Sequence, residues 1–304
     1  MFHILGAGSL GLLWATRLAG AGLDCVLLLR DQPALERWQA AGSQLTLQEN
    51  GHLQRYHVSA ELTSAQGPID RLIVATKAYS VTEALSSVAH RLLPNSDVLL
   101  LQNGLGSQQV ACKLLPAQRV LFASVTDGAW LADRRTVVWA GRGTTRVGDP
   151  LHGPEPAWLA PLRGNGVACQ WEPDILPVLW EKLAINCAIN PFTALYDCPN
   201  GAVPVKAGAR LTGVVDDLQR LLTYKHMPCT AQQLPDTVAQ VIARTAANSS
   251  SMRQDLAARR RTEIDYLLGF ACCEARGAGV PVPNLDNLYA ELQSLLAARG
   301  LPTD

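Results

Sequence analysis

The sequence predicts an α/β protein whose N-terminal part is a doubly wound, mostly parallel sheet and whose C-terminal part is all helical. Two observations support this fold class. Up to about residue 172, short apolar strands alternate with helical segments, and from residue 174 onward the apolar spacing is that of helices alone. A chain of 304 residues also exceeds what one hydrophobic core usually serves. We therefore expect two domains, at residues 1–173 and 174–304.

The chain opens with a strand, a glycine-rich turn, a helix and a second strand. A short strand that includes His3, Ile4 and Leu5 leads into Gly6-Ala7-Gly8-Ser9-Leu10-Gly11, and a stretch with helical apolar spacing follows. The second strand covers residues 25–29. A G-x-G-x-x-G turn in this context holds a dinucleotide pyrophosphate at the N-terminus of its helix. The first domain is therefore predicted to be of the Rossmann type and to bind a dinucleotide cofactor.

The residue that follows the second strand selects between the two nicotinamide cofactors. An acidic residue there would accept hydrogen bonds from the ribose hydroxyls of NAD. This chain has Arg30, whose guanidinium suits the 2′-phosphate of NADP(H). Asp31 comes next and could take the NAD role instead, with Arg30 turned to solvent. The arginine at the strand end favours NADP(H).

The rest of the first domain is predicted to hold further strands and turns. Asn50-Gly51, between TLQE and HLQRYHVS, indicates a β-hairpin. Other strands are expected at 71–76, 98–102 and 120–126, with a hairpin-like pair at 136–140 and 144–148. Glycine and proline punctuate 148–173, which suggests a linker. The loops at 76–78 and 102–106 follow strand ends, where ligands bind in open α/β sheets.

The second domain is predicted to consist of helices alone. We expect them at residues 174–190, about 206–226, 231–247, 250–276 and 285–299. Asn190-Pro191 should end or kink the first of them, because proline disfavours helical geometry in the residue before it. Gly277 and Gly300 are placed to cap the C-termini of two helices, and Asn284 to cap the N-terminus of the last.

The helix expected at 174–190 carries an unusual polar stripe. Lys182, Asn186 and Asn190 are four residues apart, so they lie one above the other on a helix whose remaining faces are apolar. Asparagine is a poor helix former, and lysine is seldom buried without a partner. A solvated stripe rich in amides is one interpretation. The other is a helix that lines a cleft and offers one ammonium and two amides to a small polar ligand.

A second set of polar residues with the same spacing lies in the segment expected to form the helix 250–276. It comprises Ser251, Asp255, Arg259 and Glu263. A solvated charged face would explain Asp255 and Arg259, and Ser251 could simply cap the helix. Spacing alone leaves Glu263 open between a surface position and a functional one.

Composition excludes several classes of partner. The formal net charge is zero and no basic run exceeds the arginines at 259–261, which argues against nucleic acid. No apolar run approaches a membrane span, and no basic leader opens the chain. The eight cysteines are scattered without a CxxC pair, as is typical of reduced thiols in a cytoplasmic protein, and the six histidines lack metal-ligand spacing. We expect no metal, a small-molecule substrate, and a monomer or homodimer.

Five sequence blocks, in order, resemble those of the ketopantoate reductase (2-dehydropantoate 2-reductase) family. They are GAGSLG, TKA, QNGLG, WEKLAINCAINPFTALYDCPNG and SSSMRQDLAARRRTEIDYL, and they extend over essentially the whole chain. The resemblance implies a Rossmann domain followed by a helical domain, with the active site in the cleft between them. It also implies NADPH-dependent reduction of the 2-keto acid 2-dehydropantoate to (R)-pantoate, on the route to pantothenate and coenzyme A.

Matched motif by motif, the resemblance assigns roles to individual residues. It implies that Lys182 is the proton donor. Residues implied to contact the substrate are Asn103, Asn186, Asn190, Asn200, Ser251 and Glu263. Residues implied to contact the cofactor are Gly6, Ala7, Gly8, Ser9, Leu10, Gly11, Leu12, Arg30, Lys77, Asn103, Ala129 and Glu263. One departure is visible, since Asp127 stands where the family pattern leads us to expect histidine.

The chemistry of the residues is consistent with this activity. Hydride addition to a keto carbon leaves an alkoxide that must be neutralised as it forms. The helical part has only His226, outside both polar sets, so the Lys182 ammonium is the natural acid. Two alternatives stay open: an NADPH-dependent reductase of another branched 2-keto acid, and an NADP-binding regulator without the chemistry. The set of Lys182, Asn186, Asn190 and Glu263 argues against the regulator, which would need no proton donor.

Overall fold

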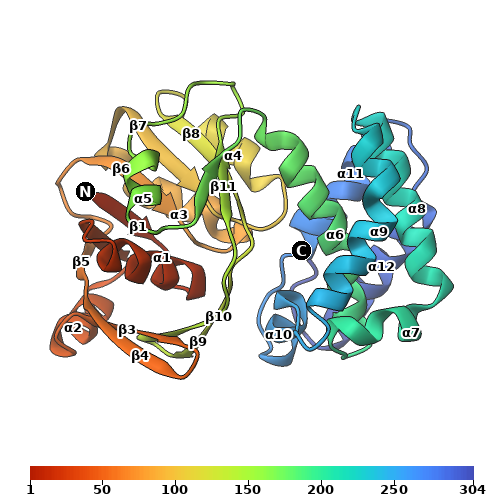
Figure 1. The fold of residues 1–304 in the computed structure, drawn as a ribbon, viewed down its shortest axis with the longest axis horizontal. Helices are drawn as coiled ribbons and strands as arrows, with labels where there is room; N and C mark the ends of the chain where they lie inside the picture. The colour runs from red at the N-terminus through yellow and green to blue at the C-terminus, as the bar shows by residue number, and fades with distance from the viewer. The chain divides into compact units, whose positions relative to one another are not determined.

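A computed structural model describes residues 1–304, which divide into two compact units (Figure 1). The sheet unit contains Met1–Gln102 and Ser107–Leu176, and the helical unit contains Asn103–Gly106 and Pro177–Asp304. One short loop from the N-terminal half thus belongs to the helical unit.

The sheet unit is built on an eight-stranded sheet of order β12-β11-β8-β7-β6-β1-β2-β5. Its strands are β1 (Phe2–Leu5), β2 (Cys25–Leu29), β5 (Ser59–Leu62), β6 (Ile69–Val74), β7 (Leu92–Leu100), β8 (Arg119–Val125), β11 (Thr145–Gly148) and β12 (Cys169–Trp171). Every pair is parallel except β8 with β11. The order β5-β2-β1-β6-β7-β8 is that of a doubly wound dinucleotide-binding sheet, which confirms the predicted fold class.

Five helices accompany this sheet: α1 (Ser9–Gly20), α2 (Gln32–Ala40), α3 (Val81–Val88), α4 (Ser107–Leu114) and α5 (Leu159–Gly164). Short 3-10 turns, η1 (Ala78–Ser80) and η2 (Ala89–Arg91), flank α3. Helix α1 is buried from Gly11 to Leu18 because it contacts strands of the eight-stranded sheet and of a second sheet (Figure 1). Its Trp14 is fully buried in the core that the two sheets share.

The second sheet has four strands in the order β4-β3-β10-β9. They are β3 (Gln44–Glu49), β4 (His52–His57), β9 (Gly128–Asp133) and β10 (Thr136–Gly141). The predicted hairpin at Asn50-Gly51 is confirmed, since Glu49 pairs with His52 and both turn residues have positive φ, 49° and 80°. Buried Leu45, Leu47 and Val137 join the core around α1.

Two predictions for this half were wrong. Residues 136–140 and 144–148 do not pair with each other, because β10 joins β3 and β9 while β11 joins β8 and β12. The stretch 148–173 is no linker, since it contains α5 and the edge strand β12. Its short apolar pieces are buried, including Leu159, Leu162 and Cys169, and burial against the sheet outweighs the local glycine and proline content.

The helical unit consists of α6 (Ile175–Leu195), α7 (Val203–Ala207), α8 (Ala209–Tyr224), α9 (Pro228–Arg244), α10 (Ser251–Ala257), a π-type turn η4 (Asp265–Gly269), α11 (Phe270–Gly277) and α12 (Pro283–Ala298), with a 3-10 turn η3 (Asn200–Ala202) before α7. Of the two outcomes expected at Asn190-Pro191, an end or a kink, the end was wrong, because α6 runs through Pro191 to Leu195. The residues around this proline, from Cys187 to Ala194, are almost all buried. Tertiary packing therefore compensates for the hydrogen bond that proline cannot donate.

The helix predicted at 250–276 is broken. Helix α10 ends at Ala257, and Arg259 adopts a left-handed conformation with φ 54°. The Arg259 N–H donates to the Leu256 carbonyl at 3.1 Å, and the Arg260 N–H donates to the Asp255 carbonyl at 2.8 Å. These two bonds form a Schellman motif, which terminates a helix. Ser251, Asp255, Arg259 and Glu263 therefore do not share one helical face.

Smaller corrections concern helix ends. The segment predicted as one helix at 206–226 is two helices separated at Gly208, which has φ 53°. Asn284 is not an N-cap: the Asp217 carboxylate from α8 caps α12, accepting from the N–H groups of Asn284 at 2.6 Å and Leu285 at 3.0 Å. Gly277 is the last residue of α11 and not its cap, whereas Gly300 follows α12 with φ 66°, as expected of a C-terminal capping glycine.

Candidate active site

The glycine turn after β1 is shaped by contacts that exclude side chains. Gly6 has φ 111°, and a Cβ added there would lie 2.8 Å from the Ala75 carbonyl carbon. A Cβ at Gly11 would lie 1.8 Å from the Gly6 carbonyl oxygen. No atom lies within 4 Å of a Cβ at Gly8, so this backbone is open to close approach by a ligand. The first and third glycines are thus needed by the fold, and the middle one leaves space.

The N-terminus of α1 can accept an anion. Gly8 is its N-cap and has no side chain that could accept from the first N–H groups of the helix. Ala7 and Gly8 are exposed, and Ser9 and Leu10 are half-buried. Leu12 differs, because its side chain is fully buried and its N–H donates to the Gly8 carbonyl at 2.9 Å. Leu12 therefore supports the turn from the core.

Arg30 and Asp31 have different surroundings at the end of β2. The Arg30 side chain is 84% exposed, and its Nε lies 3.6 Å from Asp31 Oδ2. Asp31 is the N-cap of α2, where its Oδ1 accepts from the Ala34 N–H at 2.9 Å. The carboxylate is therefore used by the fold, whereas the guanidinium lies in solvent.

The loop after β6 is held by a glutamine that the sequence reasoning did not single out. Gln102 is buried, and its Nε2 donates to the carbonyls of Val74 at 2.9 Å and Thr76 at 3.2 Å. The side-chain oxygens of Gln102 and Thr76 are buried without a hydrogen-bond partner. Lys77 follows directly as the N-cap of η1 and is half-buried. A buried amide thus fixes the strand end that carries Lys77.

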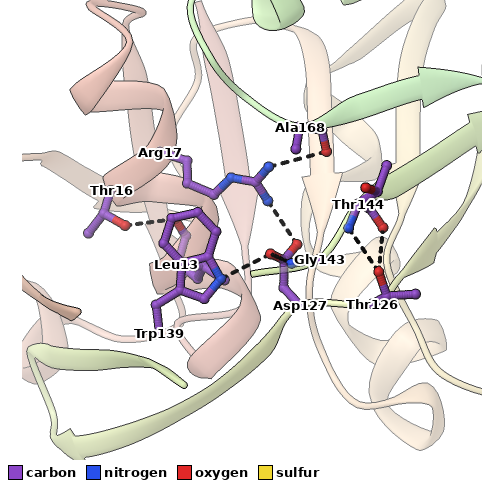
Figure 2. A network of polar contacts seen from close by, with 9 residues as sticks. All are labelled: Leu13, Thr16, Arg17, Thr126, Asp127, Trp139, Gly143, Thr144 and Ala168. Atoms are coloured by element: carbon purple, nitrogen blue, oxygen red, sulfur yellow. Dashed lines mark hydrogen bonds and ion pairs between the residues drawn. The ribbon is translucent and has the colours of Figure 1, made fainter. Parts of the chain in front are cut away.

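The unexpected Asp127 is the acceptor of a buried polar network (Figure 2). Its Oδ2 accepts from Arg17 Nη1 at 3.0 Å, and its Oδ1 accepts from Trp139 Nε1 and the Gly143 N–H, each at 3.0 Å. Arg17 also donates to the Ala168 carbonyl at 3.3 Å. Burial lowers the pKa of the Arg17 guanidinium, and the Asp127 carboxylate acts in the opposite direction. A histidine at this position could not supply the negative charge that Arg17 needs.

Lys182, Asn186 and Asn190 lie on α6, and all three are half-buried. Leu183 and Cys187, each one residue further along, are buried, so the polar stripe borders the packed side of the helix. A fully solvated stripe would show exposed side chains. The arrangement places one ammonium and two amides along a single line of the helix surface.

The far end of this stripe is connected to the start of α10. Thr193 donates to the Asn190 carbonyl at 2.7 Å, and its hydroxyl lies 2.6 Å from Ser250 Oγ. Ser250 is the N-cap of α10 and accepts from the Arg253 N–H at 3.1 Å. Ser251, which we expected as a possible cap, is instead the first helical residue, and it is exposed. The structure thus brings Asn190 and Ser251 into one neighbourhood.

Asn200 is attached to the segment that precedes α10. Its N–H donates to the Asn248 carbonyl at 3.0 Å, and its Nδ2 donates to Thr245 Oγ1 at 2.9 Å. Its Oδ1 is buried without a partner. The side chain is thereby oriented with one acceptor unused.

The loop Asn103–Gly106 packs against the turn that carries Glu263. The Leu105 N–H donates to the Tyr266 carbonyl at 2.9 Å, and the Tyr266 N–H donates to the Glu263 carbonyl at 3.2 Å. A Cβ at Gly104 would lie 2.1 Å from the Tyr266 carbonyl oxygen, so only glycine permits this approach. Glu263 itself is buried. Asn103 and Glu263 therefore lie on neighbouring segments.

The same region reaches helix α6 through aromatic side chains. Trp180 and Phe270 have ring centroids 5.6 Å apart, and a Cβ at Gly106 would lie 3.3 Å from the Phe270 ring. Trp180 precedes Lys182 by two residues. Packing therefore holds this part of helix α6, the 103–106 loop and the Glu263 turn together. Asp255 and Arg259 have other roles, because Asp255 pairs with Arg260 at 2.9 Å and Arg259 donates to the Arg299 carbonyl at 3.3 Å.

The candidate residues separate cleanly by unit. Those expected to contact only the cofactor lie in the sheet unit: Gly6 to Leu12, Arg30, Lys77 and Ala129. Those expected to contact the substrate all lie in the helical unit: Asn103, Lys182, Asn186, Asn190, Asn200, Ser251 and Glu263. The Arg17–Asp127 pair was missed, although a charged residue inside the apolar run LLWATRLAG was a visible sign of a buried partner.

Other kinds of site have no counterpart in the structure. No group of three or more His, Cys, Asp or Glu side chains is arranged to hold a metal ion, and all eight cysteines are free thiols. None of the helices combines the length and apolar character that a membrane span requires.

Comparison with known proteins identifies the family. Models of the ketopantoate reductase family PanE/ApbA match residues 2–151, and those of its C-terminal region match residues 174–295. The 2-dehydropantoate 2-reductase of Vibrio cholerae is 33% identical over 297 residues, covering 96% of both chains. A crystal structure of a PanE/ApbA family ketopantoate reductase from Ralstonia eutropha JMP134 is 28% identical, covers 98% of this chain and 99% of that one, and has a TM-score of 0.84.

A further structural match shows the fold alone. D-mandelate dehydrogenase, solved with NADH and anilino(oxo)acetate, has a TM-score of 0.87 at 20% identity and covers 99% of each chain. Fold similarity at this level does not determine a substrate. The two family matches and the 33% identity to a 2-dehydropantoate 2-reductase over almost the whole chain show the family. The chain therefore belongs to the ketopantoate reductase family, NADP-dependent oxidoreductases that reduce 2-dehydropantoate.

Proposed function

We propose that this family member reduces ketopantoate through the polar stripe of α6, with Lys182 as the proton donor. The observation that carries the proposal is the position of Lys182, Asn186 and Asn190 on one half-buried line of a single helix. An ammonium flanked by amides can hydrogen-bond a keto oxygen and hold a polar substrate at the same time.

The glycine turn is suited to a dinucleotide. The open space at Gly8 and the start of α1, where no side chain caps the helix, are what a pyrophosphate requires. Arg30, exposed at the strand end, would hold the 2′-phosphate of NADPH, and the use of Asp31 as a helix cap argues against its binding an NAD ribose. When bound, NADPH would supply the hydride to the keto carbon.

The residues of the helical unit would do the remaining work. As the keto oxygen gains negative charge, Lys182 stabilises it by a charge-assisted hydrogen bond and then donates its proton to that oxygen. Asn186 and Asn190 orient the hydroxyl of the substrate, since an amide both donates and accepts. Ser251, at the first turn of α10, would hold the carboxylate, and the unpartnered Asn200 Oδ1 would be a further acceptor for the substrate hydroxyl.

Four other residues complete the proposed site. Lys77 and Ala129 would contact the cofactor from the sheet unit. Asn103 would contact both cofactor and substrate, and Glu263 the substrate or the cofactor ribose. We further propose a cytoplasmic enzyme, supported by eight free thiols, and a monomer or homodimer.

Substrate preference tests the proposal. Ketopantoate differs from ketoisovalerate by one hydroxymethyl group, so an unpaired amide should cost about 1–3 kcal/mol, or roughly ten- to a hundredfold in kcat/KM. We expect ketopantoate to be strongly preferred, and Asn190→Ala to reduce that preference more than Asn186→Asp does. Ser251→Ala should weaken both substrates alike, because they share the carboxylate. Equal kcat/KM for the two substrates in the wild-type enzyme would instead indicate a general 2-keto acid reductase.

A further inference from the structure

Asp127 lies beside the edge of the sheet that binds ligands in open α/β folds. It follows the end of β8 at Val125 by two residues. Strands β7, β6 and β1 run parallel to β8 and end at the same edge, and the glycine turn Gly6–Gly11 leads directly from β1. Ligands bind outside the carboxyl ends of such strands. The segment that carries Asp127 therefore borders the same edge as the glycine turn.

The charges of the Arg17–Asp127 pair are withdrawn from solvent. The Arg17 side chain is 4% exposed and that of Asp127 is 0% exposed. Taking two charges out of water costs more than a simple ion pair usually returns, and a pair of apolar residues would stabilise the core at least as well. Stability alone is therefore a weak reason for this pair. A buried charged network does fix the geometry of the segments it joins.

Hydrogen bonds also restrain Thr126, the residue before Asp127. The Thr126 hydroxyl accepts from the Thr144 N–H at 2.8 Å and donates to the Thr144 carbonyl at 3.0 Å (Figure 2). A Cβ at Gly143 would lie 2.3 Å from the Thr126 carbonyl carbon, so the two segments are in direct backbone contact. The chain therefore leaves β8 in one defined direction.

The network also holds the first residues of β9. Ala129 pairs with Trp139 in the β9–β10 ladder, and the Trp139 indole donates to Asp127. The ring lies near two guanidinium groups, with Arg17 5.4 Å and Arg142 4.9 Å from its centroid. A cation over an aromatic face restrains the ring. Asp127 thus restrains Ala129 through Trp139.

We propose that Arg17 and Asp127 are a positioning pair that sets the segment Thr126–Ala129 for cofactor binding. Arg17 is on α1, the helix whose first turn would hold the pyrophosphate, and Asp127 leads into the strand that carries Ala129. The pair therefore couples two parts of the sheet unit that would contact the cofactor at different points. This inference rests on the proposed function, in which both parts contact NADPH.

A matched control pair lies at the other end of strand β8. Arg119, the first residue of β8, pairs with Asp149 at 2.8 Å and lies 5.9 Å from the centroid of the Trp171 ring. This pair has the same chemistry, a guanidinium with a carboxylate and an indole, but it lies at the amino end of β8. Asp149→Asn therefore perturbs the stability of the sheet unit without touching the ligand edge.

The test compares Asp127→Asn and Arg17→Met with Asp149→Asn. For each folded variant, the dissociation constant of NADPH is measured by fluorescence titration, and Tm by circular dichroism. We expect all three to lower Tm, and only the first two to raise the NADPH dissociation constant, by about tenfold, because small displacements of a positioning group have large effects. KM for ketopantoate should stay within about twofold, since the pair lies outside the helical unit.

The outcomes separate the explanations. If Asp127→Asn and Arg17→Met lower Tm but leave the NADPH dissociation constant within about twofold, the pair is purely structural and the proposal is wrong. Should a single variant fail to fold, the double variant Arg17→Met with Asp127→Asn removes both charges and takes its place, with the same expected loss of NADPH affinity. A wild-type enzyme that binds NADPH but does not reduce ketopantoate would overturn the proposed function and leave this test valid.

Discussion

Two glycines of the turn after β1 should respond differently to replacement by alanine. Gly8→Ala should weaken NADPH binding, and Gly11→Ala should lower the thermal stability. At Gly8 the backbone has φ −85° and ψ −175°, which alanine adopts without strain, and no atom lies within 4 Å of the new Cβ. The methyl group of Gly8→Ala would therefore enter the space that the pyrophosphate requires. We expect Tm to be unchanged and the NADPH dissociation constant to rise by at least about tenfold, or ~1.4 kcal/mol.

At Gly11 the added methyl group meets protein instead of ligand. Its Cβ would lie 1.8 Å from the Gly6 carbonyl oxygen, whereas real Cβ contacts essentially never fall below 3.0 Å, so the helix or the turn must move by more than an ångström. Overpacking of this kind costs about 1–3 kcal/mol, which for a protein of 304 residues lowers Tm by roughly 1.5 to 5 °C. Gly11→Ala should therefore unfold at a lower temperature than the wild type.

The assay for both variants is thermal unfolding without ligand, followed by NADPH titration at a temperature where each is folded. A Gly8→Ala variant that binds NADPH as tightly as the wild type would show that the pyrophosphate does not approach this turn. A Gly11→Ala variant with wild-type Tm would show that the close contact with Gly6 is not part of the folded state.

Two further predictions concern cofactor choice and pH. Arg30→Ala should weaken NADPH binding by about tenfold or more and leave NADH binding unchanged, because only the 2′-phosphate loses a charge-assisted hydrogen bond. Competition titrations measure both cofactors, and equal losses of affinity for the two would refute this prediction. His3 is buried, and desolvation lowers its pKa below the ordinary 6.5. As the pH falls below 6.5 the unfolded chain takes up this proton first, so the His3 contribution to stability is complete above 6.5 and is lost toward the lower folded pKa. Urea unfolding should show a smaller loss of stability between neutral and mildly acidic pH for His3→Gln than for the wild type, and identical slopes would contradict the assignment.

The fold class was predictable because its determinants are local. A strand, a glycine turn, a helix and a strand occur within the first 29 residues, and the helical spacing of α6 is read directly from Lys182, Asn186 and Asn190. The errors arose where tertiary contacts outweigh local preference. Pro191 stays inside α6 because its neighbours are buried, and Asp217, far away in sequence, replaces Asn284 as the cap of α12.

For the candidate site, the sequence predicts which residues share a helix face but not the contacts between distant segments. Its α6 stripe depends only on spacing, whereas the second polar set depended on a helix that Arg259 ends with its left-handed conformation. No local pattern reveals that Arg17 meets Asp127 across 110 residues. The sequence also does not show that Gly104 packs on the Tyr266 carbonyl, although this contact explains why the position holds glycine.

The central claim is that the Lys182 ammonium donates the proton to the keto oxygen, and the kcat of Lys182→Ala tests it most directly. We expect kcat with ketopantoate and NADPH to fall by about 10²–10⁴-fold, the usual effect of losing a positioned acid, while the NADPH dissociation constant stays within about twofold. Lys206→Ala, which removes an exposed ammonium bound to the Tyr196 carbonyl at 3.1 Å, is the matched control and should retain full activity. A Lys182→Ala enzyme that keeps about a tenth or more of the wild-type kcat, with the chemical step rate-limiting, would contradict the account.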